Sequence, residues 1–270
     1  MTQQITSFQN PRFKKILGLN DRRDRKKEKK FLIEGYRELS RAEIGGVPIK
    51  ELWYCKELFL GENEEALIAK IKAIGAEVFE IPKELFNKIS YRDRPDGLLG
   101  VGLFFTNTLD DLLKKIKDKK DSLILVAEGI EKPGNLGSIL RSSDAVLCDG
   151  VISCDPRTDI YNPNVIRSSV GTLFTQPVVE CSSLEAFDFL KKQGYRLLAA
   201  TPSGDKVYTD CDLKGKIAIV VGCEQLGLTP FWMDGCELKV NIPMLGVADS
   251  LNVSTATTLL LYEVRRQNPL

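Results

Sequence analysis

The chain has 270 residues, enough for two domains, and its hydrophobic content of 43% and charged content of 28% are ordinary for a globular protein. No apolar run reaches the roughly 18 residues of a membrane span and the first residues hold no apolar signal core, so we expect a cytoplasmic protein. Histidine is absent, which excludes Ser-His-Asp and Cys-His catalysis; the seven cysteines form no Cys-x-x-Cys pair, so we expect reduced thiols and no metal site.

The net charge of +1 is unevenly distributed along the chain. Residues 1–30 hold ten Lys/Arg and three acidic residues, a net charge of +7, so the remaining residues sum to −6. A basic N-terminal arm on a mildly acidic body indicates contact with a polyanion. A solvated helix face explains the alternating charges of residues 21–30 equally well.

The first half of the chain is predicted to alternate strands and helices. Apolar and β-branched runs predict strands, and apolar residues at helical spacing predict helices. In chain order we expect a strand over 31–35, a helix ending at 45–46, a strand over 49–55, a helix over 62–76, a strand over 77–82, a helix over 83–90 and a strand over 98–105. The polar, lysine-rich residues 106–121 predict a linking helix and a domain boundary.

The second half restarts the alternation. We expect strands over 123–129, 150–154, 175–181, 195–201, 216–222 and 236–243, with helices from Asn135, around 163–173, over 183–194, around 229–235 and at the end of the chain. Strands made of continuous Val, Ile and Leu are typical of a parallel sheet covered on both faces. The alternation with helices therefore predicts an open α/β sheet.

Ligands of open α/β sheets bind beyond the carboxyl ends of the strands, so the residues that follow each strand are the candidates for a site. The strand over 123–128 is followed by a glycine-containing turn in which Asn135 is placed to cap a helix. Arg141 lies six residues further on, and its guanidinium suits a phosphate. A capped strand-to-helix turn without a ligand explains most of this pattern.

Glu224 follows the strand over 216–221. An unpaired carboxylate is costly at the end of a core strand, so we expect a partner, whether a helix-start amide, an arginine or a ligand. Glu224 is explained nearly as well as an acidic residue near the start of the helix around 229–235, where it would favour the positive end of the helix dipole.

The strand over 237–242 is followed by the polar residues Asp249, Ser250, Asn252 and Ser254. Asp249 or Ser250 is expected to cap the last helix, which places Asn252 and Ser254 in its first turns, where their side chains compete with helix hydrogen bonds. Polar residues that weaken a helix start without stabilising the fold elsewhere are typical of a functional site.

Taken together, these residues resemble the SPOUT methyltransferases of the SpoU/TrmH branch. The resemblance rests on N-x-G-x-x-x-R at 135–141, G-x-E-x-x-G at 222–227 and I-P-M with S-L-N-V-S within 242–254. RSSVGTLFTQPV at 167–178 resembles the family's intermediate segment, and the first forty residues resemble the N-terminal domain of its ribosomal-RNA members. Cys223, Gln225, Leu226 and Ser168 depart from the commoner residues, which bears on target choice more than on reaction type.

The resemblance implies an α/β fold in which a parallel sheet with a trefoil knot follows a small α/β RNA-binding domain. Such a knot is a rare exception to the un-knotted topology of proteins. The implied domains are a substrate-binding domain with a basic arm over 1–105, a linker over 106–121 and a methyltransferase domain over 122–270.

The resemblance also implies S-adenosylmethionine as cofactor, held by Thr201, Gly222, Ile242, Met244 and Leu251, with Gly246 permitting a tight turn. The implied reaction is methyl transfer to a ribose 2′-hydroxyl of RNA, with 23S ribosomal RNA as the favoured substrate and no metal. The implied catalytic residues are Asn135, Arg141, Glu224, Ser250 and Asn252.

The role of Arg141 is limited by its chemistry. A guanidinium keeps its proton above pH ~12, so we expect Arg141 to bind the neighbouring phosphate and stabilise the developing alkoxide and not to act as the base. Glu224 is expected to align Arg141 or Asn135.

The family further implies a homodimer whose site borrows residues from the partner. The implied RNA contacts are basic residues of the N-terminal segment and of a later loop, although plain solvation explains them equally well: Arg12, Lys14, Lys15, Arg22, Arg23, Arg92 and Arg94.

Three other functions remain to be weighed. A dinucleotide-dependent oxidoreductase requires G-x-G-x-x-G after the first strand of the second half, and that pattern is missing. A non-catalytic RNA-binding scaffold should lack some of the candidate catalytic residues, and all of them are present. A transfer-RNA target in place of ribosomal RNA is the nearest alternative within the enzyme hypothesis.

Overall fold

A computed structural model describes residues 2–269 of the chain, which divides into two compact units. Unit 1 comprises Met1–Phe105 together with Asp159–Thr175, and unit 2 comprises Thr106–Thr158 together with Gln176–Leu270. Helix α6 (Leu109–Ile116) is the expected linking helix and belongs to unit 2. The segment 159–175 belongs to unit 1 although it lies within the second half of the sequence.

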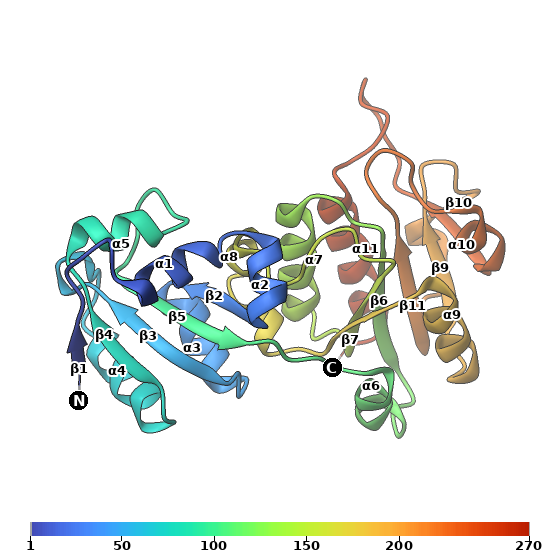
Figure 1. Ribbon diagram of the computed structural model, residues 1–270. Coiled ribbons are helices and arrows are strands. Elements are labelled where there is room, and N and C mark those ends of the chain that lie inside the picture. The colour runs from blue at the N-terminus through green and yellow to red at the C-terminus, as the bar shows by residue number, and fades with distance from the viewer. Residues whose placement is uncertain (1, 270) are drawn as a thin grey trace. The chain divides into compact units, whose positions relative to one another are not determined.

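Unit 1 is built on a mixed five-stranded sheet of order β1-β4-β3-β5-β2 (Figure 1). Strand β5 runs antiparallel to β2 and β3, while β1, β3 and β4 are parallel. The strands are β1 (Thr2–Gln4), β2 (Lys30–Glu34), β3 (Ile49–Tyr54), β4 (Glu77–Glu80) and β5 (Leu98–Leu103). The helices are α1 (Pro11–Gly18), α2 (Arg22–Glu28), α3 (Tyr36–Ile44), α4 (Glu64–Ala73), α5 (Lys83–Ile89) and α8 (Pro163–Ser168), with 3₁₀ turns η1 (Lys56–Leu58) and η2 (Thr172–Phe174).

The strands and helices predicted over 31–105 are confirmed, but the helix predicted around 163–173 is divided. Helix α8 ends at Ser168, and Val170 and Gly171 take positive φ angles of 53° and 79° before η2 begins. Left-handed backbone interrupts a helix, so the apolar periodicity alone placed its end too late.

The basic N-terminal segment is folded into β1, α1 and α2. Phe13 and Ile16 of α1 pack in the core of unit 1 with Trp53 and Phe79. Sequence patterning did not predict β1 or α1, and the apolar residues of α1 are few and lie among lysines and arginines. The helix weighed as one explanation for the charges of residues 21–30 is present as α2. The cations of the segment are therefore carried on ordered structure.

Arg25 on α2 lies in the interior of unit 1, with a side-chain exposure of 1%. Its guanidinium forms an ion pair with Asp159 at 2.8 Å and donates to the carbonyl oxygens of Leu19 and Asn20 at 3.0 and 2.8 Å. It is thus a structural residue and not one of the solvated cations of the segment.

We expect Arg25→Ala to lower the free energy of unfolding of unit 1 by about 3–5 kcal/mol, because it leaves the buried carboxylate of Asp159 unpaired. Urea denaturation checks this. Arg23→Ala, in the same helix but exposed, should change it by less than about 0.5 kcal/mol. Equal effects of the two variants would contradict the assignment.

Unit 2 is built on an all-parallel seven-stranded sheet of order β10-β12-β9-β11-β6-β7-β8. The strands are β6 (Ser122–Glu128), β7 (Gly150–Cys154), β8 (Val178–Cys181), β9 (Arg196–Ala200), β10 (Lys206–Val207), β11 (Lys216–Val221) and β12 (Leu238–Asn241). Its other helices are α7 (Pro133–Ala145), α9 (Ser183–Lys192), α10 (Pro230–Gly235) and α11 (Val253–Gln267), with the 3₁₀ turn η3 (Tyr208–Asp210). The predicted α/β class with a C-terminal parallel sheet is confirmed, and the knot stays a prediction.

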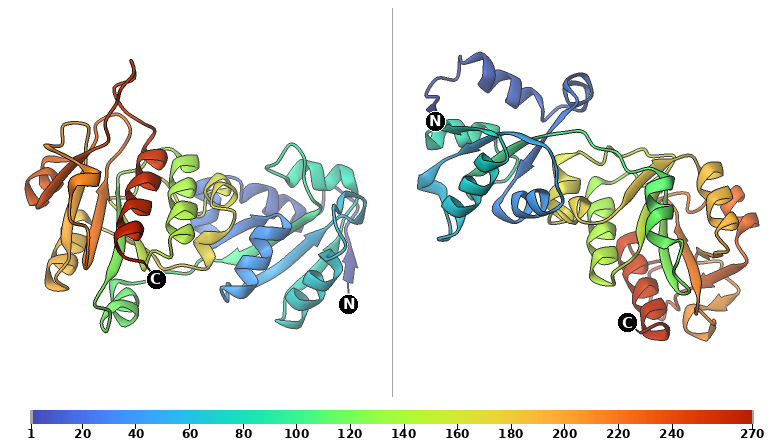
Figure 2. Two further views of the ribbon diagram at one scale, coloured as in Figure 1. Left: turned by 180° about the vertical axis from the view of Figure 1, so that it is seen from behind. Right: turned by 90° about the horizontal axis from the view of Figure 1, so that it is seen from below.

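Helices cover both faces of the sheet in unit 2. Apolar side chains of α6, α9 and α10 form one core with the central strands, including Leu112, Leu190 and Trp232. Helices α7 and α11 pack against each other, and α11 also contacts β11 (Figure 2). This arrangement explains why β6 is buried along its whole length and reads as a continuous apolar run. Within residues 2–269, no helix is both long and apolar enough to cross a membrane.

Candidate active site

A cleft of about 680 Å³ lies at the carboxyl ends of β9, β11 and β12 in unit 2. Its walls are residues at the ends of these strands and beyond them, at 200–203, 221–228 and 249–253, together with Val240, Ile242 and Met244. The volume falls in the range of small-molecule sites, and the position is the one expected for ligands of an open α/β sheet. The five predicted cofactor residues all line this cleft: Thr201, Gly222, Ile242, Met244 and Leu251.

The wall that follows β11 is a tight loop from Gly222 to Gly227. A Cβ atom on Gly222 would lie 2.3 Å from the carbonyl carbon and oxygen of Gly227. Gly227 itself takes a positive φ of 67°, and Cys223 pairs with it in an isolated antiparallel bridge. The loop therefore needs glycine at both ends, once for close approach and once for backbone conformation.

Three of the predicted catalytic residues form a continuous chain of hydrogen bonds. Asn252 Nδ2 donates to Asn135 Oδ1 at 3.1 Å, and Asn135 Nδ2 donates to Glu224 Oε1. Glu224 thus has the expected partner, which is Asn135 and not Arg141. The second oxygen, Glu224 Oε2, is buried and has no hydrogen-bond partner among residues 2–269. The chain joins the loops after β6, β11 and β12.

The predicted helix caps were wrong in both places. Helix α7 begins at Pro133 after Lys132, so Asn135 lies inside its first turn, where its side chain is free to reach Glu224. Helix α11 begins at Val253, and its cap is Asn252, not Asp249 or Ser250.

Asn252 uses its two amide atoms for different purposes. Its Oδ1 accepts from the backbone nitrogen of Ser254 at 2.9 Å and from Ser254 Oγ at 2.7 Å, while its Nδ2 donates to Asn135. The cap therefore fixes the orientation of the amide that contacts the hydrogen-bonded chain. This also explains part of the polar stretch before α11 in purely structural terms.

Arg141 lies apart from this chain, on the third turn of α7. Its side chain is exposed, it does not line the cleft, and it makes no hydrogen bond or ion pair within the described part of the chain. Ser250 lines the cleft and is exposed. The structure therefore brings together Asn135, Glu224, Asn252 and the cleft, and leaves Arg141 outside them.

The cleft contains residues that the sequence did not single out. Lys132 lines it from the turn before α7, and Ala256 and Leu260 line it from α11. Lys132 could have been noticed, because it lies only three residues before Asn135. Gly246 is not in the left-handed region, and no atom within residues 2–269 lies within 4 Å of a Cβ built there, so the tight turn that the resemblance implies at Gly246 stays a prediction.

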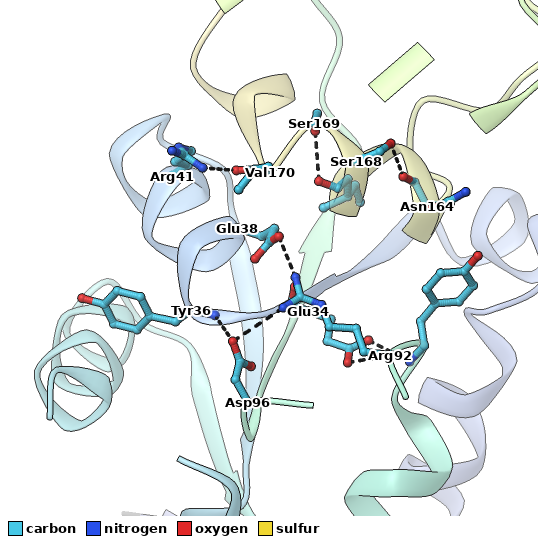
Figure 3. A network of polar contacts seen from close by, with 12 residues as sticks. Glu34, Tyr36, Glu38, Arg41, Arg92, Asp96, Asn164, Ser168, Ser169 and Val170 are labelled. Atoms are coloured by element: carbon cyan, nitrogen blue, oxygen red, sulfur yellow. Dashed lines mark hydrogen bonds and ion pairs between the residues drawn. The ribbon is translucent and has the colours of Figure 1, made fainter. Parts of the chain in front are cut away.

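The predicted RNA-binding cations differ in their surroundings. Lys14, Lys15, Arg22, Arg23 and Arg94 are exposed. Arg12 forms an ion pair with Glu77 at 2.8 Å and stacks over the ring of Phe79. Arg92 is half-buried and forms an ion pair with Glu38 at 2.6 Å (Figure 3). Arg92 is thus part of an internal network of unit 1.

Similarity to known proteins bears on both units. Residues 122–262 match the SpoU rRNA Methylase family, and residues 10–100 match the MRM3-like substrate binding domain. The chain is 32% identical over 277 residues to the 23S rRNA (uridine(2479)-2'-O)-methyltransferase of Streptomyces viridochromogenes, covering 98% of this chain and 92% of that one.

Two solved structures are similar over nearly the whole chain. An RNA 2'-O ribose methyltransferase superposes with a TM-score of 0.86 at 37% identity, covering 99% of this chain and 100% of the other. The AdoMet-bound rRNA methyltransferase from Sinorhizobium meliloti gives a TM-score of 0.89 at 28% identity, covering 100% and 99%.

Fold and site together define a two-unit α/β protein whose ligand cleft lies at the end of an all-parallel sheet. The family match covers more than half of the chain and includes the residues that build this cleft. The chain belongs to the SpoU rRNA methylase family, and it carries an MRM3-like substrate-binding domain at its N-terminal end.

Proposed function

We propose that this protein transfers a methyl group from S-adenosylmethionine to a ribose 2′-hydroxyl of ribosomal RNA, with 23S RNA as the specific target. The observation that carries the proposal is the cleft itself: five predicted cofactor residues line it, beside a hydrogen-bonded chain of Asn252, Asn135 and Glu224. Relatives with this reaction in their names are similar to the chain over nearly its full length.

The residues of the cleft fit the cofactor. Its volume of about 680 Å³ suits a ligand of nucleoside size, and the tight loop from Gly222 to Gly227 forms one of its walls. When bound, S-adenosylmethionine supplies a methyl group on an already activated sulfonium. The protein's task is then to position the acceptor hydroxyl, which is the larger part of such catalysis.

The amides of Asn135 and Asn252 are suited to orient that hydroxyl. Asn252 is held by the helix cap, and Asn135 is held from both sides by Asn252 and Glu224. Such preorganised donors cost no rearrangement at the moment of reaction. Ser250 is placed on the same wall of the cleft to add a hydroxyl to this set.

Arg141 acts in this proposal on the cleft of a second copy of the chain. It is exposed on α7 and makes no hydrogen bond or ion pair to any residue from 2 to 269. Helix α7 packs on α11, whose surface carries the exposed apolar residues Leu259 and Tyr262 one turn apart, and Leu147 follows α7. We infer that this face forms a homodimer interface, as apolar patches of monomers usually mark contacts.

We expect Tyr262→Glu to convert the proposed dimer to a monomer, because it replaces an exposed apolar side chain of this face by a charge that the interface would bury. Light scattering after size-exclusion chromatography measures the mass. Leu184→Glu, on the exposed surface of α9, is the matched control and should leave the mass unchanged. A monomeric parent protein would contradict the interface.

Unit 1 is proposed to bind the RNA through its exposed cations. We expect the double variant Lys14→Gln/Lys15→Gln to weaken RNA binding and to lower the slope of log Kd against log salt by about 1–2. Each lysine–phosphate contact releases counterions from the RNA on binding, so two lost contacts reduce the number released. Lys70→Gln/Lys72→Gln on α4 is the control. An unchanged slope would show that these lysines are solvated and do not contact the RNA. Deleting the segment is unsuitable, since it removes core residues Phe13 and Ile16.

The test of the proposed function is methyl transfer. Purified protein is incubated with labelled S-adenosylmethionine and unmodified ribosomal RNA or transfer RNA, and the RNA is digested to nucleosides that are identified by mass. A 2′-O-methylnucleoside from ribosomal RNA supports the proposal. Label on a base would contradict transfer to the ribose hydroxyl, and label in transfer RNA alone would make transfer RNA the substrate.

We also infer that the protein works in the cytoplasm, which its seven free thiols support.

A further inference from the structure

Unit 1 contains a second cleft, of about 740 Å³, that the proposed methyl transfer does not use. It is lined by the start of α3, the stretch before α4, the loop before β5 and residues 167 and 170. Figure 3 shows the polar contacts of Tyr36, Glu38, Arg92 and Asp96 that border it. Its charged lining consists of four arginines and four acids: Arg37, Arg92, Arg94, Arg167, Glu38, Glu64, Asp93 and Asp96. This balance distinguishes it from a site for a bare anion, which carboxylates would repel.

The positive and negative side chains of this cleft differ in their exposure to solvent. Arg37, Arg94 and Arg167 are exposed and have no ion pair to any described residue, 2 through 269. Unpaired guanidiniums at a rim suit the phosphates of a nucleic acid backbone. The acids Glu38 and Glu64 are buried, so the interior of the cleft offers acceptors where the rim offers cations.

The interior is held rigidly. Arg92 forms an ion pair with Glu38 at 2.6 Å, and Asp96 Oδ2 accepts from the backbone nitrogen of Tyr36 at 2.8 Å. Gly35 takes a φ of 109°, and a Cβ there would lie 2.4 Å from Glu38 Oε2 and 2.6 Å from Arg92 Nη2. The pair therefore occupies space that only a glycine leaves open.

Three polar atoms of these residues are buried without a partner in the part of the chain that the structure describes. They are Glu64 Oε2, Asp96 Oδ1 and Arg92 Nε. Glu64 is only 4% exposed, and its other oxygen accepts from the backbone nitrogens of Leu60 and Gly61 at 3.1 and 2.8 Å. Buried polar groups are costly when they lack a hydrogen-bond partner, so three such atoms around one cleft point to a ligand that completes them.

These three atoms define what the ligand must offer. Glu64 Oε2 and Asp96 Oδ1 are acceptors and need two donors, and Arg92 Nε is a donor and needs an acceptor. The Watson–Crick edge of guanine offers two adjacent donors, N1–H and N2–H, beside the acceptor O6. Uracil and adenine each offer one donor group on this edge. Tyr36, half-buried in the cleft lining, supplies a ring on which an unstacked base can lie.

We propose that this cleft binds an unpaired guanosine of the RNA substrate, with Glu64 and Asp96 accepting from the base and Arg37, Arg94 and Arg167 binding the flanking phosphates. The inference rests on the proposed function only in taking RNA as the ligand. It adds a base-reading site in unit 1, separate from the cleft of unit 2.

Binding of short labelled oligoadenylates tests this with the full-length protein and no cofactor. One oligonucleotide carries a central guanosine, a second carries inosine, which lacks the N2 amino group, and a third is all adenosine. We expect the guanosine form to bind about fivefold or more tightly than the other two by fluorescence anisotropy.

Two isosteric variants test whether the preference for guanosine arises from Glu64 and Asp96. Glu64→Gln and Asp96→Asn keep the oxygen that accepts from backbone nitrogens and replace the unpaired acceptor by a donor, so each should remove the guanosine preference. Glu64→Gln should leave the melting temperature unchanged, whereas Asp96→Asn should lower it slightly because it also removes the 3.7 Å ion pair between Asp96 and Arg92. Glu65→Gln is the matched control, because Glu65 is the next residue on α4 and is exposed. The control should keep the preference.

Equal binding of guanosine and inosine by the parent protein would overturn the proposal, as would a preference that survives both isosteric variants. The methyl transfer assay is independent of this measurement. Methylation without guanosine preference would refute the cleft assignment alone, whereas guanosine preference without methylation would support the cleft and refute the proposed reaction.

Discussion

Replacing Arg141 by alanine is expected to reduce methyl transfer by about 10²–10³-fold in kcat while leaving the affinity for S-adenosylmethionine nearly unchanged. The reason is its position. Arg141 does not line the cofactor cleft and is exposed on α7, so its removal disturbs neither the cleft walls nor the chain of Asn252, Asn135 and Glu224. In the proposed function, what is lost is the cation expected to stabilise the developing alkoxide and to bind the neighbouring phosphate.

Single-turnover transfer and calorimetric binding of the cofactor separate the two effects. Arg141→Lys keeps the charge without the planar fork and should recover part of the rate. Light scattering on the same samples shows whether the dimer persists. Loss of cofactor binding in Arg141→Ala would place the residue in the cofactor site and contradict the role proposed for it.

Replacing Gly222 by alanine is expected to weaken cofactor binding by about 5–150-fold, which corresponds to the roughly 1–3 kcal/mol of strain that overpacking causes. The new methyl group would meet the carbonyl group of Gly227 at 2.3 Å and the backbone nitrogen of Leu228 at 2.5 Å. Backbone atoms cannot move aside as a side chain can, so the whole loop from 222 to 227 must shift.

Isothermal titration of the cofactor measures this loss. Gly246→Ala is the matched control, since Gly246 belongs to the segment that follows β12 and a Cβ there would have no neighbour within 4 Å in residues 2–269. The control should bind the cofactor as the parent does. Equal losses in both variants, or a full loss of folding in Gly222→Ala, would remove the argument from loop geometry.

The sequence predicted the secondary structure well where one rule dominated. Continuous apolar strands identified the sheet of unit 2, because strands covered on both faces, such as β6 and β11, leave no polar alternation. It failed at β1, which consists of Thr2, Gln3 and Gln4, and at α1, whose few apolar residues lie among charges. The stability of α1 comes from packing of Phe13 and Ile16 against residues of β3, β4 and α5, which no local pattern reveals.

The residues of the candidate site were predictable, but their connections were not. Asn135, Glu224 and Asn252 were found because each is a polar residue in a segment that follows a predicted strand and matches a family motif. That Asn135 bonds to Glu224, that Asn252 caps α11, and that Arg141 lies apart depend on where α7 and α11 begin and how they pack. A shift of two residues in a helix start turns a side chain by about half a turn.

By itself, the sequence determined the alternation of strands and helices, the parallel character of the second sheet, the family and the residues that gather at its strand ends. Those properties follow from hydrophobic periodicity and from short motifs, which are local in the chain. Only the tertiary structure decided that the segment 159–175 belongs to unit 1, that Arg25 is a buried ion-pair partner and that Glu64, Arg92 and Asp96 share a second cleft. These depend on contacts between residues far apart in sequence, and burial alone determines whether a charged residue is solvated, paired or left open for a ligand.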